Sequence, residues 1–94
     1  MPGPNFRKVA AIDILLVCEH LGIQLKRQGK TFRGKCPICS HPSKRAFCVT
    51  KELNRFWCHG YCSAGGDVLE LYTQIRSLNK YLAALELLRL FPPN

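Results

Sequence analysis

Six cysteines are the residues of this sequence best suited to chemistry, and four of them fall in two short clusters. Cys36 and Cys39 form a C-x-x-C pair, and after eighteen intervening residues Cys58 and Cys62 form a second pair with three residues between them. Tetrahedral Zn2+ favours four soft ligands delivered by two tight turns, so this spacing predicts one structural Zn2+ in a zinc ribbon. Two disulfides are the alternative, and the absence of a secretory signal disfavours them.

The fourth ligand of this zinc site has two candidates. Cys58 is the favoured ligand, and His59, which lies three residues before Cys62, is the alternative. His41 follows Cys39 by two residues, and we interpret it as a solvated loop histidine. A closed site of four protein ligands leaves no open position for a substrate or an activated water, so the zinc is expected to be structural.

The formal net charge of +8 is concentrated around the cysteines. Residues 24–57 contain nine basic residues and one acidic residue, Glu52. Cations neutralise phosphates, and aromatic faces can stack on unpaired bases, so basic residues interleaved with aromatic ones are typical of single-strand binding. The candidate nucleic-acid-binding residues are Lys26, Arg27, Lys30, Phe32, Arg33, Lys44, Arg45, Arg55 and Trp57.

The segments around the clusters predict an α+β fold, a small antiparallel sheet flanked by one N-terminal and two C-terminal helices. Asn5 suits an N-cap, and a helix is expected over residues 6–21 from the helical spacing of Phe6, Val9, Ile12 and Leu16. Alternating apolar residues predict two hairpins, at residues 23–34 and 46–58. In the second hairpin, Trp57 should point away from the face that Phe56 occupies.

Two adjacent glycines follow the second cluster. We interpret Gly65 and Gly66 as a break in the sheet that leads into a helix, which Asp67 and Glu70 would begin with a capping box. Asn79 is expected to cap a last helix that ends at Pro92 and Pro93, with inward-facing residues Tyr81, Leu82, Leu85 and Leu88.

Length and hydropathy bound the remaining possibilities. Ninety-four residues predict one small domain, residues 1–94, whose core is marginal without help. Structural zinc can supply on the order of 10 kcal/mol that couples to folding. The apolar run at residues 9–17 is too short to span a membrane, and nothing targets the chain, so a cytoplasmic location is expected.

Three segments carry a family resemblance. Residues 25–37, 46–49 and 56–68, which end in Cys-Ser-Ala-Gly-Gly-Asp-Val, resemble the N-terminal zinc-binding domain of bacterial DnaG-type DNA primases. The resemblance implies that Cys36 and Cys62 are zinc ligands and that Cys39 stands where the primases usually have histidine. The primases have C-x-x-C in the second cluster, so counting back from Cys62 favours His59, whereas counting forward from the aromatic pair favours Cys58.

The resemblance also implies a function. The expected role is engagement of single-stranded template DNA in primer synthesis or mobile-element replication. The alternative is a non-catalytic subunit that docks on a separate primase, polymerase or helicase chain. A third interpretation is the zinc-dependent part of a larger enzyme. The six acidic residues are scattered, without the clustered carboxylates of a primase catalytic domain, so no catalysis by this chain is expected.

Overall fold

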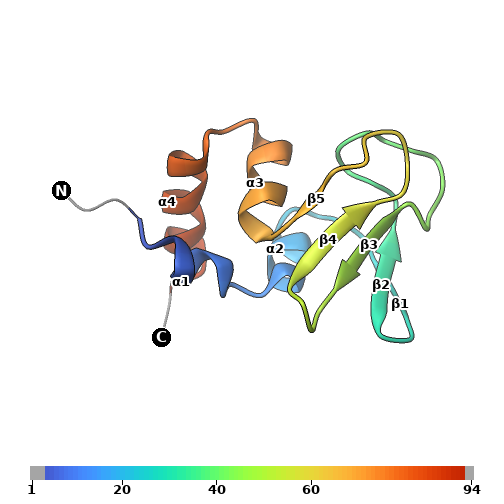
Figure 1. Cartoon of the computed structure of the whole chain (residues 1–94), viewed down its shortest axis with the longest axis horizontal. Helices are drawn as coiled ribbons and strands as arrows, with labels where there is room; N and C mark the ends of the chain where they lie inside the picture. Colours follow the sequence, from blue (N-terminus) through green and yellow to red (C-terminus); the bar gives the residue numbers. More distant parts are fainter. Residues whose placement is uncertain (1–3, 93–94) are drawn as a thin grey trace.

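A computed structural model describes residues 4–92, and it confirms the predicted α+β class. One antiparallel sheet has the strand order β1-β2-β3-β4-β5. Helices gather at one end of the molecule and the sheet forms the other end (Figure 1). The elements are α1 (Phe6–Ala10), α2 (Ile14–His20), β1 (Lys26–Gln28), β2 (Thr31–Gly34), β3 (Phe47–Thr50), β4 (Arg55–Cys58), β5 (Gly65–Gly66), α3 (Val68–Arg76) and α4 (Lys80–Leu90).

The N-terminal helix is broken in two, so the prediction of one helix over residues 6–21 is wrong. Asn5 caps α1 as expected, accepting hydrogen bonds from two backbone N–H groups. Asp13 then caps α2, and its carboxylate accepts a hydrogen bond of 2.9 Å from the Leu15 N–H. The changed direction of the chain leaves Phe6 and Leu16 half exposed, although helical periodicity placed both in the apolar stripe.

A side chain from the β3–β4 turn holds this break. The Asn54 amide donates to the carbonyl oxygens of Ala10 at 2.9 Å and Ile12 at 2.7 Å, and it accepts from the Ile14 N–H at 2.8 Å. Asn54 itself has a φ of +54°, a conformation that asparagine tolerates better than most residues. Three backbone groups left unpaired by the break are therefore satisfied by a residue some forty positions away.

The sheet has one face on the core and one face in solvent. The cross-strand partners Phe32, Val49 and Phe56 lie on the inner face, where Val49 and Phe56 are buried. Gly65 and Gly66 do not end the sheet as expected, because they form β5 and pair with Trp57 and Phe56. A side chain at Gly65 would collide with the Trp57 ring, so glycine permits this close approach.

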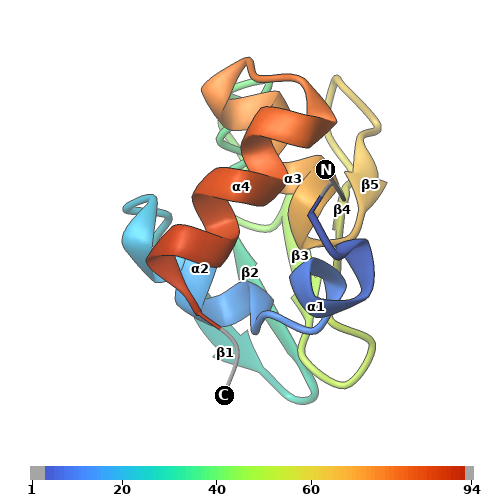
Figure 2. The same cartoon turned by 90° about the vertical axis from the view of Figure 1, so that its left-hand side faces the viewer.

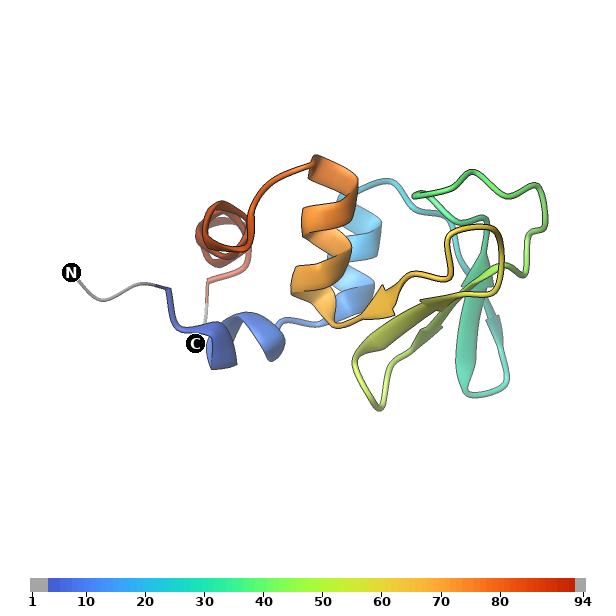
Figure 3. The ribbon, with the colours of Figure 1, turned by 45° about the horizontal axis from the view of Figure 1, so that its top comes forward.

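Helix α3 lies between the sheet and α4 (Figure 3). Asp67 caps it by accepting from the Glu70 N–H at 3.0 Å, and the apolar residues Val68, Leu71 and Tyr72 on its inner side are buried. Figure 2 shows α4 crossing the outside of the helical end. No helix within residues 4–92 is long and apolar enough to cross a membrane.

The predicted inner face of α4 is wrong at Tyr81, Leu82 and Leu85, whereas Leu88 packs partly against the core. The fully buried residues of this helix are Ala83, Ala84 and Leu87, and Leu88 is partly buried. Helix α4 packs on α3 and α1, and small alanines at the contact let helix axes approach closely. The larger residues on the opposite side stay exposed, at 52% for Tyr81, 47% for Leu82 and 43% for Leu85. Of the two prolines expected to stop the helix, Pro92 follows its end and Pro93 lies outside the described residues.

Candidate metal centre and nucleic-acid interface

Strand direction explains why the two cysteine clusters meet. Both β2 and β4 pair antiparallel with β3, so they run in the same direction and finish at the same end of the sheet. Gly34, Phe47 and Cys58 lie opposite one another in that register. The turn with Cys36 and Cys39 follows β2 directly, and Cys58 is the last residue of β4.

The four sulfur atoms fit a tetrahedral zinc ion. The Sγ atoms of Cys36, Cys39, Cys58 and Cys62 all lie within 4.8 Å of one another. Cys36 and Cys62 are 3.7 Å apart at sulfur, as are Cys39 and Cys58. Zn–S bonds of about 2.3 Å in a tetrahedron require sulfurs about 3.8 Å apart, whereas a disulfide requires about 2.0 Å. The four cysteines form a zinc-binding site, and the disulfide alternative is wrong, since all six thiols are free.

Burial and hydrogen bonds shift the pKa values of Cys36, Cys39 and Cys62. The Ile38 N–H donates to the Cys36 sulfur at 3.4 Å, and the Gly60 N–H donates to the Cys58 sulfur at 3.2 Å. Burial raises the pKa of Cys36 to about 12 and also raises the pKa of Cys62. Burial acts in the same direction on Cys39, but hydrogen bonds from the backbone and neighbouring thiols outweigh it and lower that pKa to about 6. Zinc must therefore displace protons from part of the cluster.

The two histidines near the clusters lie outside the sulfur tetrahedron. Alternation along β4 buries Cys58 completely and turns the next residue, His59, into solvent, where its ring lies 6.4 Å from that of Trp57. His41 is half buried, and its ring centre is 4.3 Å from that of Tyr61. A β-carbon on Gly60 would lie only 2.8 Å from the Cβ of His41, so this loop packs closely and is less solvated than expected.

The remaining two cysteines have different surroundings. Cys18 is buried in the core, and burial, with a smaller effect of the Asp13 carboxylate, raises its pKa to about 12. Cys48 is half buried on the solvent face of the sheet. Its neighbours across the strands are Arg33 and Trp57.

Several predicted nucleic-acid-binding residues share the solvent face of the sheet. Lys26, Arg33, Cys48, Trp57 and Gly65 are cross-strand partners in one row, which we call the outer row. Trp57 is 47% exposed, as its predicted orientation requires. Arg55 lies two positions before Trp57 on β4, so the pleat places it on the same face.

Other predicted residues lie elsewhere. Arg27 and Phe32 form the row on the opposite face, and Phe32 packs partly buried against the core. Lys30 is exposed in the β1–β2 turn. The structure therefore separates Phe32 from the exposed aromatic Trp57.

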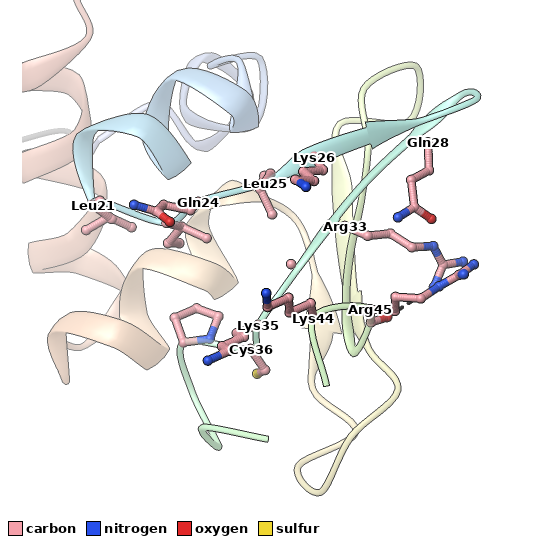
Figure 4. Close-up of a pocket in the computed structure, with 14 residues that line it drawn as sticks. Leu21, Gln24, Leu25, Lys26, Gln28, Arg33, Lys35, Cys36, Lys44 and Arg45 are labelled. Carbon is pink, nitrogen blue, oxygen red and sulfur yellow. Dashed lines mark hydrogen bonds between the residues drawn. The ribbon is translucent and has the colours of Figure 1, made fainter. Parts of the chain in front are cut away.

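The outer row continues into a groove of about 830 Å³ beside the first cysteine cluster (Figure 4). One wall is apolar and includes Leu21, Leu25 and Pro37. The described residues that line the groove include no carboxylate, and its cations are Lys26, Arg33, Lys35, Lys44 and Arg45. We call it the basic groove. The Arg33 guanidinium donates to the Arg45 carbonyl oxygen at 3.1 Å, which ties β2 to the loop that follows the first cluster.

Lys35, Gln24 and Gln28 also line the basic groove and were not among the predicted site residues. The alternation of β2 carries a signal for Lys35, because it lies two positions after Arg33 and so on the same face. Gln28 lies two positions after Lys26 on β1, so alternation gives it a similar signal, whereas Gln24 precedes the strand and faces the groove through the path of the chain before β1.

Two cysteine turns that meet at the end of an antiparallel sheet define a zinc ribbon. The chain belongs to the CHC2 zinc finger family, whose model matches residues 7–91. The crystal structure of Aquifex aeolicus primase, which contains zinc binding and RNA polymerase domains, matches with a TM-score of 0.80 and 28% sequence identity. That match covers 97% of this chain and 22% of the primase chain. A comparison with curated proteins finds no match. The resemblance to primase zinc-binding domains is confirmed.

Proposed function

We propose that this zinc ribbon binds single-stranded DNA, as a template-engaging module in primer synthesis or mobile-element replication. The observation that supports it is the outer row, in which the exposed Trp57 ring lies on the same face as Arg33 and Lys26. An aromatic face that stacks on a base beside cations that neutralise phosphates is the usual arrangement for single strands. The family and the similarity to a primase support the same substrate.

The outer row and the basic groove give the bound strand a path. Lys26 on β1 and Trp57 on β4 are separated by three strand spacings of about 4.8 Å, or about 14 Å. A stacked strand, with a rise of about 3.4 Å per nucleotide, covers this distance with about four nucleotides, and a more extended strand covers it with fewer. We therefore expect oligonucleotides of two nucleotides to bind much more weakly than oligonucleotides of eight.

Fluorescence anisotropy of labelled single-stranded and duplex DNA, across several salt concentrations, tests this function. Arg33→Ala should reduce the salt slope by about one phosphate contact, and Trp57→Ala should weaken binding by about 1–3 kcal/mol while leaving the slope unchanged. Arg7→Ala is the matched control, because Arg7 is an exposed cation on α1 at the other end of the molecule. An unchanged salt slope for Arg33→Ala, or tighter binding to duplex DNA than to single-stranded DNA, would count against the proposal.

We propose that the chain performs no catalysis of its own and acts in the cytoplasm. The structure gives most of the acidic side chains local tasks. Asp13 and Asp67 cap helices, Glu70 accepts from Gln74, and Glu86 accepts from the Tyr72 hydroxyl. Carboxylates used in this way are not grouped to hold catalytic metal ions.

A second candidate function is a subunit that docks on a separate primase, polymerase or helicase chain. The observation that favours it is the exposed apolar side of α4. Co-purification with such a chain, together with undetectable DNA affinity near physiological salt, would favour this function over the first.

A further inference from the structure

Helix α4 has apolar residues both on the side that packs against the protein and on the side that faces solvent. Eight of its eleven residues are apolar, and the three that are charged are Lys80, Glu86 and Arg89. Ala83, Ala84 and Leu87 face the interior, while a second set of apolar residues faces out. Figure 2 shows α4 at the front of the helical end, with no other described element across it. A helix that is apolar all round is normally covered on all sides.

The outward residues form one stripe and are not scattered. Tyr81, Leu82 and Leu85 occupy positions i, i+1 and i+4, and Leu88 at i+7, which packs partly against the core, forms the inner edge of the stripe. We call these four residues the α4 stripe. Tyrosine and large apolar residues in a contiguous patch are typical of the centre of a protein interface.

The exposed charges at the two ends of the α4 stripe are both positive. Lys80 lies at its start and Arg89 near its end, and both are exposed. Glu86, the acidic residue of this helix, is already engaged, since it accepts from the Tyr72 hydroxyl at 2.7 Å and lies 3.7 Å from Arg76. The stripe is therefore bounded by uncompensated positive charge at both ends.

This charge distribution excludes a second copy of the chain as the favoured occupant. An antiparallel pairing of two α4 helices would bring Lys80 of one copy near Arg89 of the other. A parallel pairing would bring each cation near its own equivalent. Like charges that face each other across an interface oppose association, so both symmetric arrangements are disfavoured.

We propose that the α4 stripe binds an amphipathic helix of a different protein, one with apolar anchors at i, i+3 or i+4, and i+7 and with carboxylates on both sides of them. This inference rests on the second candidate function and is independent of DNA binding. The α4 stripe and the outer row lie toward opposite ends of a molecule 44 Å long, so both can be occupied at once. The chain would then connect a nucleic acid to a protein.

Two helical peptides test the proposal by calorimetry with the zinc-loaded protein. Both carry leucines at the anchor positions, and one has glutamates and the other lysines at its ends. We expect the glutamate peptide to bind about tenfold more tightly, because its carboxylates attract Lys80 and Arg89, whereas the lysines of the other peptide are repelled by them. The double variant Lys80→Glu, Arg89→Glu should reverse this order.

Leu85→Gln tests the apolar anchor. This substitution keeps helix propensity, and Leu85 is exposed, so the variant should fold and retain zinc. It should weaken binding of the glutamate peptide at least about fivefold. Leu53→Gln, at an exposed position in the β3–β4 turn, is the matched control and should change nothing.

Several outcomes would overturn the proposal. They are equal affinity for the two peptides, no binding of either, or binding that survives Leu85→Gln. Sedimentation velocity that shows a dimer abolished by Leu85→Gln would assign the stripe to a second copy instead. If a separate primase chain still co-purifies with Leu85→Gln, the second candidate function stands and its assignment to α4 fails. DNA titration of the same variant keeps the first function separate, since its affinity should not change.

Discussion

Exchange of Cys58 for serine should weaken zinc binding strongly, whereas loss of the adjacent His59 side chain should not. Cys58 is fully buried, and its sulfur lies 3.7 Å from that of Cys39. His59 is exposed, and the ring contact found for it is with Trp57. The two residues are neighbours in the chain, so the pair of variants tests the ligand set with little change elsewhere.

The expected loss of zinc affinity can be worked out from the binding free energy that the four ligands share. Zinc binding of on the order of 10 kcal/mol, divided among four sulfurs, gives about 2.5 kcal/mol for each. Cys58→Ser should therefore lower zinc affinity about 70-fold. A domain of this length has a total stability of roughly 5–14 kcal/mol, so the same change should markedly lower the unfolding midpoint. His59→Ala should cost less than about 0.5 kcal/mol, as is usual for surface substitutions.

Competition with a chromogenic chelator measures zinc affinity, and thermal unfolding with and without added zinc measures the coupling. The variant that loses metal should be the variant that loses stability. A His59→Ala protein that loses zinc as readily as Cys58→Ser, or a Cys58→Ser protein with undiminished affinity, would refute the assignment of the fourth position.

Three further predictions concern the fold and the thiols. Zinc affinity should rise with pH between about 6 and 9, and zinc binding should release protons. The raised pKa values of Cys36 and Cys62 keep those thiols protonated until the metal displaces the protons. A flat profile in a proton-release titration would contradict this. Asn54→Ala should destabilise the fold by about 3 kcal/mol in urea unfolding, because three hydrogen bonds are lost. Asn79→Ala, which removes a single helix cap, should cost about 1 kcal/mol. Equal losses of stability in the two variants would argue against the role of Asn54. A thiol reagent at pH 8 should label Cys48 first in the zinc-loaded protein. Cys18 should react much more slowly, because it is buried in the core and burial raises its pKa to about 12. Rapid labelling of Cys18 would show that the core opens readily.

The metal centre could be predicted from the sequence because its determinants are local. The C-x-x-C turn fixes Cys36 and Cys39, and the alternation of apolar residues in β4 places Phe56 and Cys58 on the same buried face. The same alternation turns His59 outward, so strand periodicity distinguishes the two candidates for the fourth position better than counting back from Cys62 does.

The errors arose where a distant residue decides the local structure. The break between α1 and α2 depends on Asn54, which no pattern near residue 12 reveals. The inner face of α4 could not be chosen from periodicity, because apolar residues cover both sides of that helix and the side that fits α3 is the one with Ala83 and Ala84. The strand at Gly65 can pair beside the Trp57 ring because glycine has no side chain to collide with it, a contact that no local pattern reveals.

The position of the zinc site connects metal binding to the basic groove. Cys36 and Cys39 hold the start of the loop that carries Lys44 and Arg45, while Cys58 ends the strand that carries Trp57. Zinc held by these cysteines would keep this loop against β2, where the Arg33 guanidinium donates to the Arg45 carbonyl oxygen. A Zn2+ with four thiolates has a net charge of −2, which lowers the formal charge of +8 to about +6, so the metal reduces the attraction for phosphate. If removal of zinc weakens DNA binding, the cause must therefore be the lost geometry of the groove, since the change in charge acts in the opposite direction.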